Sequence, residues 1–203
     1  MDLPLLALIA TLLTYWLGVG VMVVRVRRHA RRVVGVVPEQ GRERLMGLAW
    51  IPVVILWLAL PLLAAQRPQS GFAVPAWALA TDWWGLVRGG AAIVAVGSLA
   101  ATVKCWARMG KDWRMAVTAE PTQPLITDGL FARIRHPIYA FSILLMISTM
   151  IILPTPVMLM VGAAHITLML LKARNEERHL LAHHGAAYAD YLARTGRFVP
   201  RRR

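Results

Sequence analysis

Two short polar segments of this sequence carry the side chains best suited to hold and orient a charged ligand. They are RIRHP at residues 133–137 and KARNEER at residues 172–178. Arginine and histidine donate hydrogen bonds to a carboxylate, whereas a glutamate accepts them from hydroxyls or an ammonium. The donors are Arg133, Arg135 and His136, and the acceptors are Glu176 and Glu177. Together they predict a site for a zwitterionic ligand that bears a carboxylate, an amine and a sugar diol.

The second segment also has a simpler interpretation, which is a salt-bridged helix surface. On a helix, Arg174 and Glu177 share a face because they are three residues apart. Lys172 and Glu176, four residues apart, share a face as well. Both interpretations are open for this segment by itself, and its pairing with the arginine-rich segment favours the ligand site.

Five apolar segments must position these clusters, and they predict an all-α integral membrane protein with five transmembrane helices. The sequence is 58% apolar with a mean hydropathy of +0.55, above the composition of a usual soluble domain. The first two runs are uncharged and long enough to cross a hydrocarbon core of about 30 Å. The third carries Arg88 and Lys104 near its ends, and the last two, with 16 residues each, are slightly short. The five segments are residues 3–24, 45–65, 86–107, 138–153 and 156–171.

Charged residues near the membrane boundaries predict the orientation of these helices. The net charge is +13, and seven, five and eight of the 23 Lys and Arg lie in residues 25–44, 108–136 and 172–203. Only Arg67 and Arg88 lie on the other side, and we expect Arg88 to reach the interface from a span end. The bias places the N-terminus outside and the C-terminus in the cytoplasm. Orientation and anionic lipid therefore account for the basic charge, and nucleic-acid binding is not expected.

We expect three regions along the chain. Residues 1–65 hold two N-terminal transmembrane helices, residues 66–85 form an extracytoplasmic loop, and residues 86–203 form the core that carries the chemistry. The first helix is expected to be retained and not cleaved as a signal peptide, because it starts with the acidic Asp2 and no A-x-A-like site follows.

The turn LPTP, residues 153–156, predicts that the fourth and fifth spans form an antiparallel hairpin, because its prolines cannot continue a helix. Both ends of the hairpin then emerge into the cytoplasm, and the two polar segments become neighbours in space. Residues 179–200 follow with an amphipathic pattern broken at Gly185. We expect a cytoplasmic amphipathic helix there that lies against the membrane face and closes a pocket.

Other side chains are weaker candidates for chemistry. Trp113 either stacks on a flat ring of the substrate or anchors the chain at the interface. His165 lies inside the fifth span, where it either contacts the substrate or bonds a neighbouring helix as a neutral ring. His179 and His183 have the spacing of metal ligands but no third ligand nearby, so no metal is expected. Cys105 is better explained as a small buried apolar residue than as a nucleophile.

Three segments resemble those of the isoprenylcysteine carboxyl methyltransferase family, which includes phospholipid N-methyltransferase relatives. GLFARIRHPIY resembles its arginine–histidine–proline segment, and RNEERHLLAHHGAAYADYLARTGRFVP resembles its closing pattern. MGKDWR is similar to a third, weaker segment, and the resemblance covers roughly residues 89–200. Phe131 stands where the family usually has Tyr, and Leu130 where Pro is common, so a ligand contact through that Tyr hydroxyl is absent here.

The resemblance implies a membrane methyltransferase that uses S-adenosylmethionine and methylates a lipophilic acceptor entering from the lipid. The cofactor pocket is expected between the hairpin and the C-terminal segment, at the cytoplasmic face. Carried over to this sequence, Arg174 would be catalytic at the reaction centre. The cofactor-binding residues would be Arg135, His136, Tyr139, Glu176, Glu177 and Tyr188.

Two other functions fit the same sequence. Membrane reductases of the sterol and steroid type resemble this C-terminal region and bind NADPH, although they are usually longer. The other possible function is non-catalytic, with basic loops that bind anionic lipid. We favour the methyltransferase, with a carboxylate or thiol of an isoprenoid-like substrate as acceptor, and leave prenylcysteine, another thiol or acid and a phospholipid amine open. The compact, arginine-rich chain favours a prokaryotic cell membrane.

Overall fold

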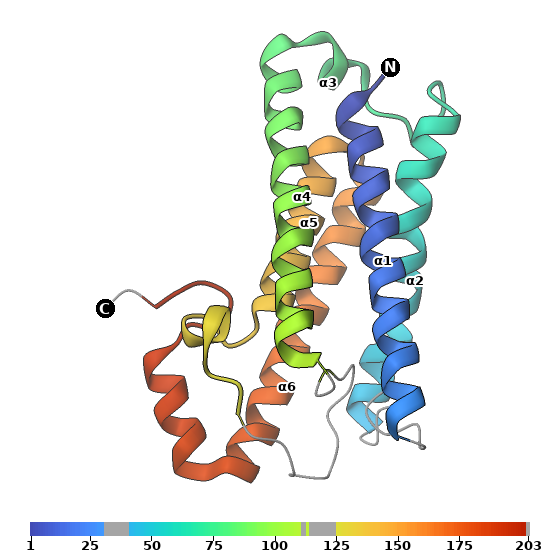
Figure 1. The fold of residues 1–203 in the computed structure, drawn as a ribbon. Coiled ribbons are helices and arrows are strands. Elements are labelled where there is room, and N and C mark those ends of the chain that lie inside the picture. The colour runs from blue at the N-terminus through green and yellow to red at the C-terminus, as the bar shows by residue number, and fades with distance from the viewer. Residues whose placement is uncertain (31–40, 111–112, 114–124, 202–203) are drawn as a thin grey trace.

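A computed structural model describes residues 1–30, 41–110, 113 and 125–201 of the chain. These residues fold into helices and form no β-strand (Figure 1). The elements are α1 (Leu3–Ala30), α2 (Gly41–Gln66), α3 (Ala76–Ala80), α4 (Asp82–Met109), the 3₁₀ turn η2 (Gly129–Ala132), α5 (Pro137–Ile152) and α6 (Pro156–Arg194). The all-helical class predicted from the sequence is thus confirmed.

Within the described residues, four helices are long and apolar enough to cross a membrane. They are Leu3–Arg28 within α1, Arg44–Gln66 within α2, and all of α4 and α6. The shorter α5 is also apolar. Many large apolar side chains on these helices point outward, and Leu17, Leu86 and Ile93 are 71, 72 and 75% exposed. Such a surface suits lipid and not water, so the chain is an integral membrane protein.

Helix ends follow from local chemistry. The Asp2 carboxylate accepts from the backbone N–H of Leu5 at 3.1 Å and starts α1. The Thr155 side chain accepts from the N–H of Met158 at 3.2 Å and starts α6, with Pro156 in the first turn. Pro137 takes the corresponding position in α5, so a helix begins directly after His136.

The α5–α6 hairpin predicted from LPTP is present, and it divides the molecule into two ends (Figure 1). The hairpin turn, α3 and the N-terminus lie at one end, and η2, the last part of α6 and the C-terminus lie at the other. Within the bundle, α4 packs against α5 and α1, and α2 packs against α6. The two polar segments therefore meet at the end opposite the hairpin turn.

Arg88 differs from its expected position at the interface. Its side chain is 3% exposed, and it donates to the Ile152 carbonyl at 3.0 Å and to the Asp2 carboxylate at 2.5 Å. Because a charge in an apolar bundle needs partners, the guanidinium turns inward to an anion and a helix-end carbonyl. It thereby ties the start of α1 and the end of α5 to α4.

The last helix continues past residue 171, the end of the fifth predicted span, before it breaks. α6 continues without interruption through residues 172–184 and has a single non-helical residue, Gly185, with φ 50° and ψ −125°. The chain then folds back, and the Tyr191 hydroxyl donates to the Phe131 carbonyl at 2.6 Å (Figure 1). The break at Gly185 was predicted, and the position of residues 186–194 on a membrane face stays a prediction.

Candidate functional site

The C-terminal tail is bonded along the backbone of the segment that precedes α5. The Arg135 N–H donates to the Gly196 carbonyl at 2.8 Å, and the His136 N–H donates to the Arg197 carbonyl at 3.1 Å. In return, the Gly196 N–H donates to the Arg133 carbonyl at 3.1 Å. These bonds hold residues 195–197 beside the start of α5, so that chain positions far apart in sequence build one site.

Glu177 is the ionic centre of this junction. Its side chain is 10% exposed, and its carboxylate accepts from Arg135 Nε at 2.9 Å and from Arg197 Nη2 at 2.5 Å. Arg135 also donates to the carbonyls of Leu192 and Thr195. Two guanidinium groups around one buried carboxylate form a paired cluster that fixes the tail to α6.

Glu176, the next residue, belongs to a different group of contacts. Its carboxylate accepts from the Tyr139 hydroxyl at 3.0 Å and lies 3.5 Å from His136 Nδ1. The His136 and Tyr139 rings stack with their centroids 5.4 Å apart. Burial opposes the charged form of His136, but the carboxylates of Glu176 and Glu177 outweigh it and raise the pKa of this histidine.

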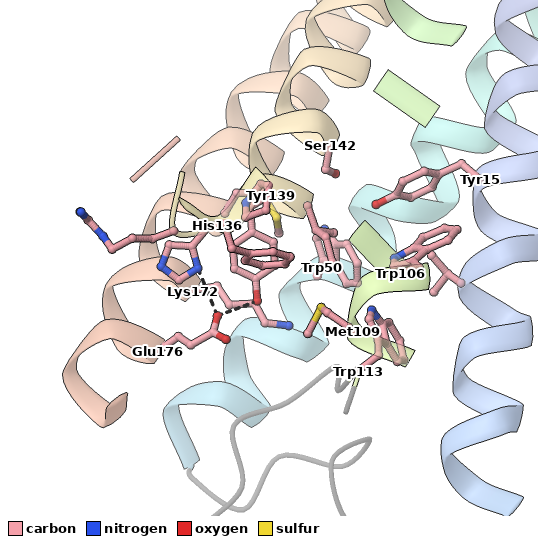
Figure 2. Close-up of a pocket in the computed structure, with 16 residues that line it drawn as sticks. Tyr15, Trp50, Trp106, Met109, Trp113, His136, Tyr139, Ser142, Lys172 and Glu176 are labelled. Carbon is pink, nitrogen blue, oxygen red and sulfur yellow. Dashed lines mark hydrogen bonds and ion pairs between the residues drawn. The ribbon is translucent and has the colours of Figure 1, made fainter. Parts of the chain in front are cut away.

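These groups line one end of a pocket of about 740 Å³, a volume that includes its opening (Figure 2). The polar residues at this end of the lining are Arg135, His136, Tyr139, Lys172 and Glu176. The ammonium of Lys172 lies 5.9 Å from the centre of the Trp50 ring and 5.8 Å from that of Tyr139. This end therefore offers both cationic donors and an anionic acceptor.

The rest of the pocket is mainly aromatic. Rings of five residues line it, namely Tyr15, Trp50, Trp106, Trp113 and Phe131. Figure 2 shows Tyr15 and Ser142 on the side away from Glu176 and Lys172, with Trp50 between them. The Trp106 ring nitrogen is buried and has no hydrogen-bond partner among the described residues. A pocket with an ionic end and an aromatic end suits a ligand that is itself polar at one end and flat or apolar beyond it.

Residues 91–183 match the model of the isoprenylcysteine carboxyl methyltransferase (ICMT) family. This part of the chain is ICMT-like. The match includes α5, most of α4 and the part of α6 that carries Glu176 and Glu177. It indicates a membrane methyltransferase, as predicted from the three sequence segments. No curated protein matches the chain.

The ICMT-like pocket collects five of the residues predicted from the sequence. Arg135, His136, Tyr139, Glu176 and Trp113 all line it. They come from the tail junction, from α5, from α6 and from the region after α4, which confirms that the two polar segments are neighbours.

Four predicted site residues lie elsewhere in the ICMT-like structure. Arg174 is exposed on α6 and outside the pocket lining. Glu177 sits behind Glu176 in the tail junction. Tyr188 is 1% exposed, and its hydroxyl has no partner in the described part of the chain. His165 is fully buried behind the pocket wall, where it bonds two neighbouring helices. Their roles in binding or catalysis stay predictions.

Among the pocket residues that were not predicted from the sequence are three aromatic ones with a polar atom, namely Tyr15, Trp50 and Trp106. Tyr15 and Trp50 lie in the helices before residue 91, which are outside the family match. The available signal was chemical, because tyrosine and tryptophan inside an apolar span each carry a polar atom that requires a partner. Trp106 carries the same signal within the third predicted span.

The predicted spacing of His179 and His183 has an internal explanation. Nδ1 of His183 bonds the His179 carbonyl at 2.9 Å, and the two ring centres are 3.9 Å apart. Among the residues that the structure describes, no three His, Cys, Asp or Glu side chains are grouped to hold a metal ion.

Proposed function

We propose that this protein transfers a methyl group from S-adenosylmethionine to a lipophilic acceptor at the cytoplasmic face of a membrane. The acceptor we favour is a carboxylate or thiol of an isoprenoid-like molecule. The observation that carries this proposal is the pocket, most of whose lining residues lie in the ICMT-like region. Its ionic end and its aromatic end match the two halves of such a reaction.

The ionic end fits the polar groups of S-adenosylmethionine. Glu176 keeps one carboxylate oxygen that accepts from Tyr139 and a second that can accept from a ribose diol or an ammonium. His136 and Lys172 supply positive charge for a carboxylate on the same side. The faces of Trp50 and Trp113 provide flat surfaces for a purine ring. When bound, S-adenosylmethionine supplies the activated methyl group on its sulfonium.

The chain itself then has to orient the reactants and exclude water. A carboxylate or thiolate acceptor needs no general base, so the residues contribute through position and desolvation. The aromatic side chains from α1, α2 and α4 restrict the access of water to the inner part of the pocket. Arg174, exposed on α6 a short distance before Glu176, is proposed to orient an anionic acceptor that arrives from the lipid.

The topology proposed with this function has five spans. The short α5 crosses together with the four longer helices, and the end with the pocket faces the cytoplasm. The pocket would then open where soluble S-adenosylmethionine is available, while the lipid-facing helices give a lipophilic acceptor its route.

Thermal unfolding of detergent-solubilised protein tests the cofactor. S-adenosylmethionine should raise the melting temperature, as any ligand that binds only the folded state does. Glu176→Gln should weaken this effect about tenfold in midpoint concentration, because a hydrogen bond to a charged group is lost. The matched control is Arg178→Ala, an exposed change on the same helix. Stabilisation by NADPH and not by S-adenosylmethionine would contradict the proposal.

A further inference from the structure

A chain of hydrogen bonds runs behind the inner wall of the pocket and ends inside it. The Trp50 ring nitrogen donates to His165 Nδ1 at 3.3 Å. Nε2 of the same histidine lies 3.1 Å from Ser142 Oγ. The Ser142 hydroxyl faces the Tyr15 hydroxyl at the inner end of the pocket (Figure 2). The bonded chain thus joins α2, α6 and α5, and its two ends, Trp50 and Ser142, line the pocket together with Tyr15 of α1.

The direction of this chain is set at Trp50. An indole N–H can only donate, so His165 Nδ1 must accept, and the proton of the neutral ring is on Nε2. Nε2 therefore donates to Ser142. Because Ser142 accepts from His165, its own proton remains to be donated to the Tyr15 oxygen that faces it, and the Tyr15 proton then points into the pocket.

A second donor lies beside this terminal hydroxyl. The Trp106 ring is tilted against the Tyr15 ring, with the centroids 5.6 Å apart. Its N–H is buried and has no partner in the described ranges, and Trp106 is one of the residues that line the pocket. Trp106 as a whole is 6% exposed. A buried donor without a partner costs roughly 1–3 kcal/mol, which a ligand atom can recover.

The inner end of the pocket is thus rich in donors. Glu176, the carboxylate among the described lining residues, lies on the opposite side with Lys172 (Figure 2). An ammonium or an amine N–H placed at the inner end would meet Tyr15 and Trp106, whose polar hydrogens repel it. An oxygen that carries lone pairs and no proton would accept from both.

We propose that Tyr15 and Trp106 form a donor subsite that selects a proton-free oxygen of the lipophilic reactant, such as a carboxylate or an ester or amide carbonyl. His165 is the positioning residue that keeps the Tyr15 hydroxyl donating into the pocket. The inference rests on the proposed function only in taking the ligand of this subsite to be the methyl acceptor. It assigns selection of the acceptor to α1 and α4, with support from α2, α5 and α6.

Two probes with the same alkyl chain and opposite hydrogen-bond character test the subsite. Dodecanoate and dodecylammonium are titrated in a nonionic detergent, and the midpoint of the rise in melting temperature is recorded. Wild type should respond to dodecanoate at a lower concentration. Tyr15→Phe should raise the dodecanoate midpoint about tenfold and leave the dodecylammonium midpoint unchanged, because only a donor is removed. Comparing variants cancels any general preference of a basic protein for an anion.

Replacing a tryptophan by phenylalanine keeps an aromatic ring and removes its N–H, so it tests the N–H as the donor. Trp106→Phe should weaken dodecanoate binding in the same way. Trp16→Phe is the control, because its ring nitrogen is also buried without a partner in the described chain, but it does not line the pocket. An equal effect of the two changes, equal midpoints for both probes in wild type, or no saturable response to dodecanoate would overturn the subsite.

Conservative replacement tests the positioning role. His165→Gln should keep the dodecanoate preference, since its amide oxygen can accept from Trp50 and its amide nitrogen can donate to Ser142. His165→Leu should lose the preference to the same extent as Tyr15→Phe. If both His165 variants lower the melting temperature but keep the preference, the histidine is only structural and its positioning role is wrong. If His165→Leu does not fold, Tyr15→Phe and His165→Gln decide.

The proposed function can fail separately from the subsite. Tyr15→Phe should leave the response to S-adenosylmethionine unchanged, because the ionic end is intact. A wild-type protein that prefers dodecanoate but gives no response to S-adenosylmethionine would refute the methyltransferase and leave the subsite standing. The reverse result would refute the subsite alone.

Discussion

At the residue scale, two adjacent glutamates have different surroundings. Glu177 is enclosed by Arg135 and Arg197 at the tail junction, whereas Glu176 lines the pocket with a side chain that is 33% exposed. Sequence reasoning predicted both as cofactor ligands and could not separate them. Helix geometry explains the difference, since consecutive residues point about 100° apart around the axis.

This difference predicts that replacing Glu177 affects stability, whereas replacing Glu176 affects ligand binding. Glu177→Gln should lower the free energy of unfolding by about 3 kcal/mol, because two guanidinium groups lose their anion and one of them is buried. Glu176→Gln should change the free energy of unfolding little and weaken S-adenosylmethionine binding about tenfold. Denaturation and ligand titration of both variants measure this. Identical behaviour of the two would mean that they form one structural unit.

His136 predicts a pH dependence of stability. Its pKa is raised by Glu176 and Glu177 against the effect of burial, so the folded state binds the proton more tightly than the unfolded state. The stabilising contribution is complete below the unfolded pKa of about 6.5 and is lost as pH rises through the folded pKa. The melting-temperature advantage of wild type over His136→Gln should therefore be larger near pH 6 than near pH 9. A constant difference across that range would show that His136 is neutral in its pair.

At the element scale, the junction between the C-terminal tail and the start of α5 carries the site. Gly196 has no room for a side chain, because a Cβ there would collide with the Val199 carbonyl. Gly196→Ala should therefore detach the tail, expose Glu177 and reduce S-adenosylmethionine binding. Gly90→Ala is the matched control, because a Cβ at this position in α4 meets nothing and should stabilise the helix by up to about 1 kcal/mol. Limited proteolysis of the tail reads out detachment, and equal resistance of both variants would contradict the account.

The sequence predicted elements better than contacts between them. The apolar runs, the turn at residues 153–156 and the break at Gly185 are local signals that proline, glycine and hydropathy carry directly. The bond between Arg197 and Glu177 depends on the tail folding back, which no local pattern encodes. The same holds for Trp50 and His165, which meet because α2 packs against α6.

At the scale of the whole molecule, the account requires one orientation in the membrane. After Cys105→Ala removes the native thiol, a cysteine at Gln69 should react with a membrane-impermeant reagent in intact cells. A cysteine at Ala193 should react only after the cells are permeabilised, because the basic end is proposed to face the cytoplasm. The opposite pattern would place the pocket on the outer face.

The partners of buried polar groups could not be predicted from the sequence. Arg88 was expected at the interface, yet it crosses inward to Asp2 and the Ile152 carbonyl. In an apolar bundle each such group selects its partner after the helices have packed. The spans could therefore be predicted from hydropathy, while the inner wall of the pocket could not.

Methyl transfer itself tests the central claim most directly. The purified protein is incubated with methyl-labelled S-adenosylmethionine and a total membrane lipid extract, and the labelled product is identified. The account predicts label on a carboxylate or thiol of a lipophilic molecule, with most of the rate lost in Arg174→Ala at unchanged cofactor affinity. Two results together would contradict the proposed methyl transfer: folded protein gives no labelled lipophilic product, and S-adenosylmethionine does not raise its melting temperature.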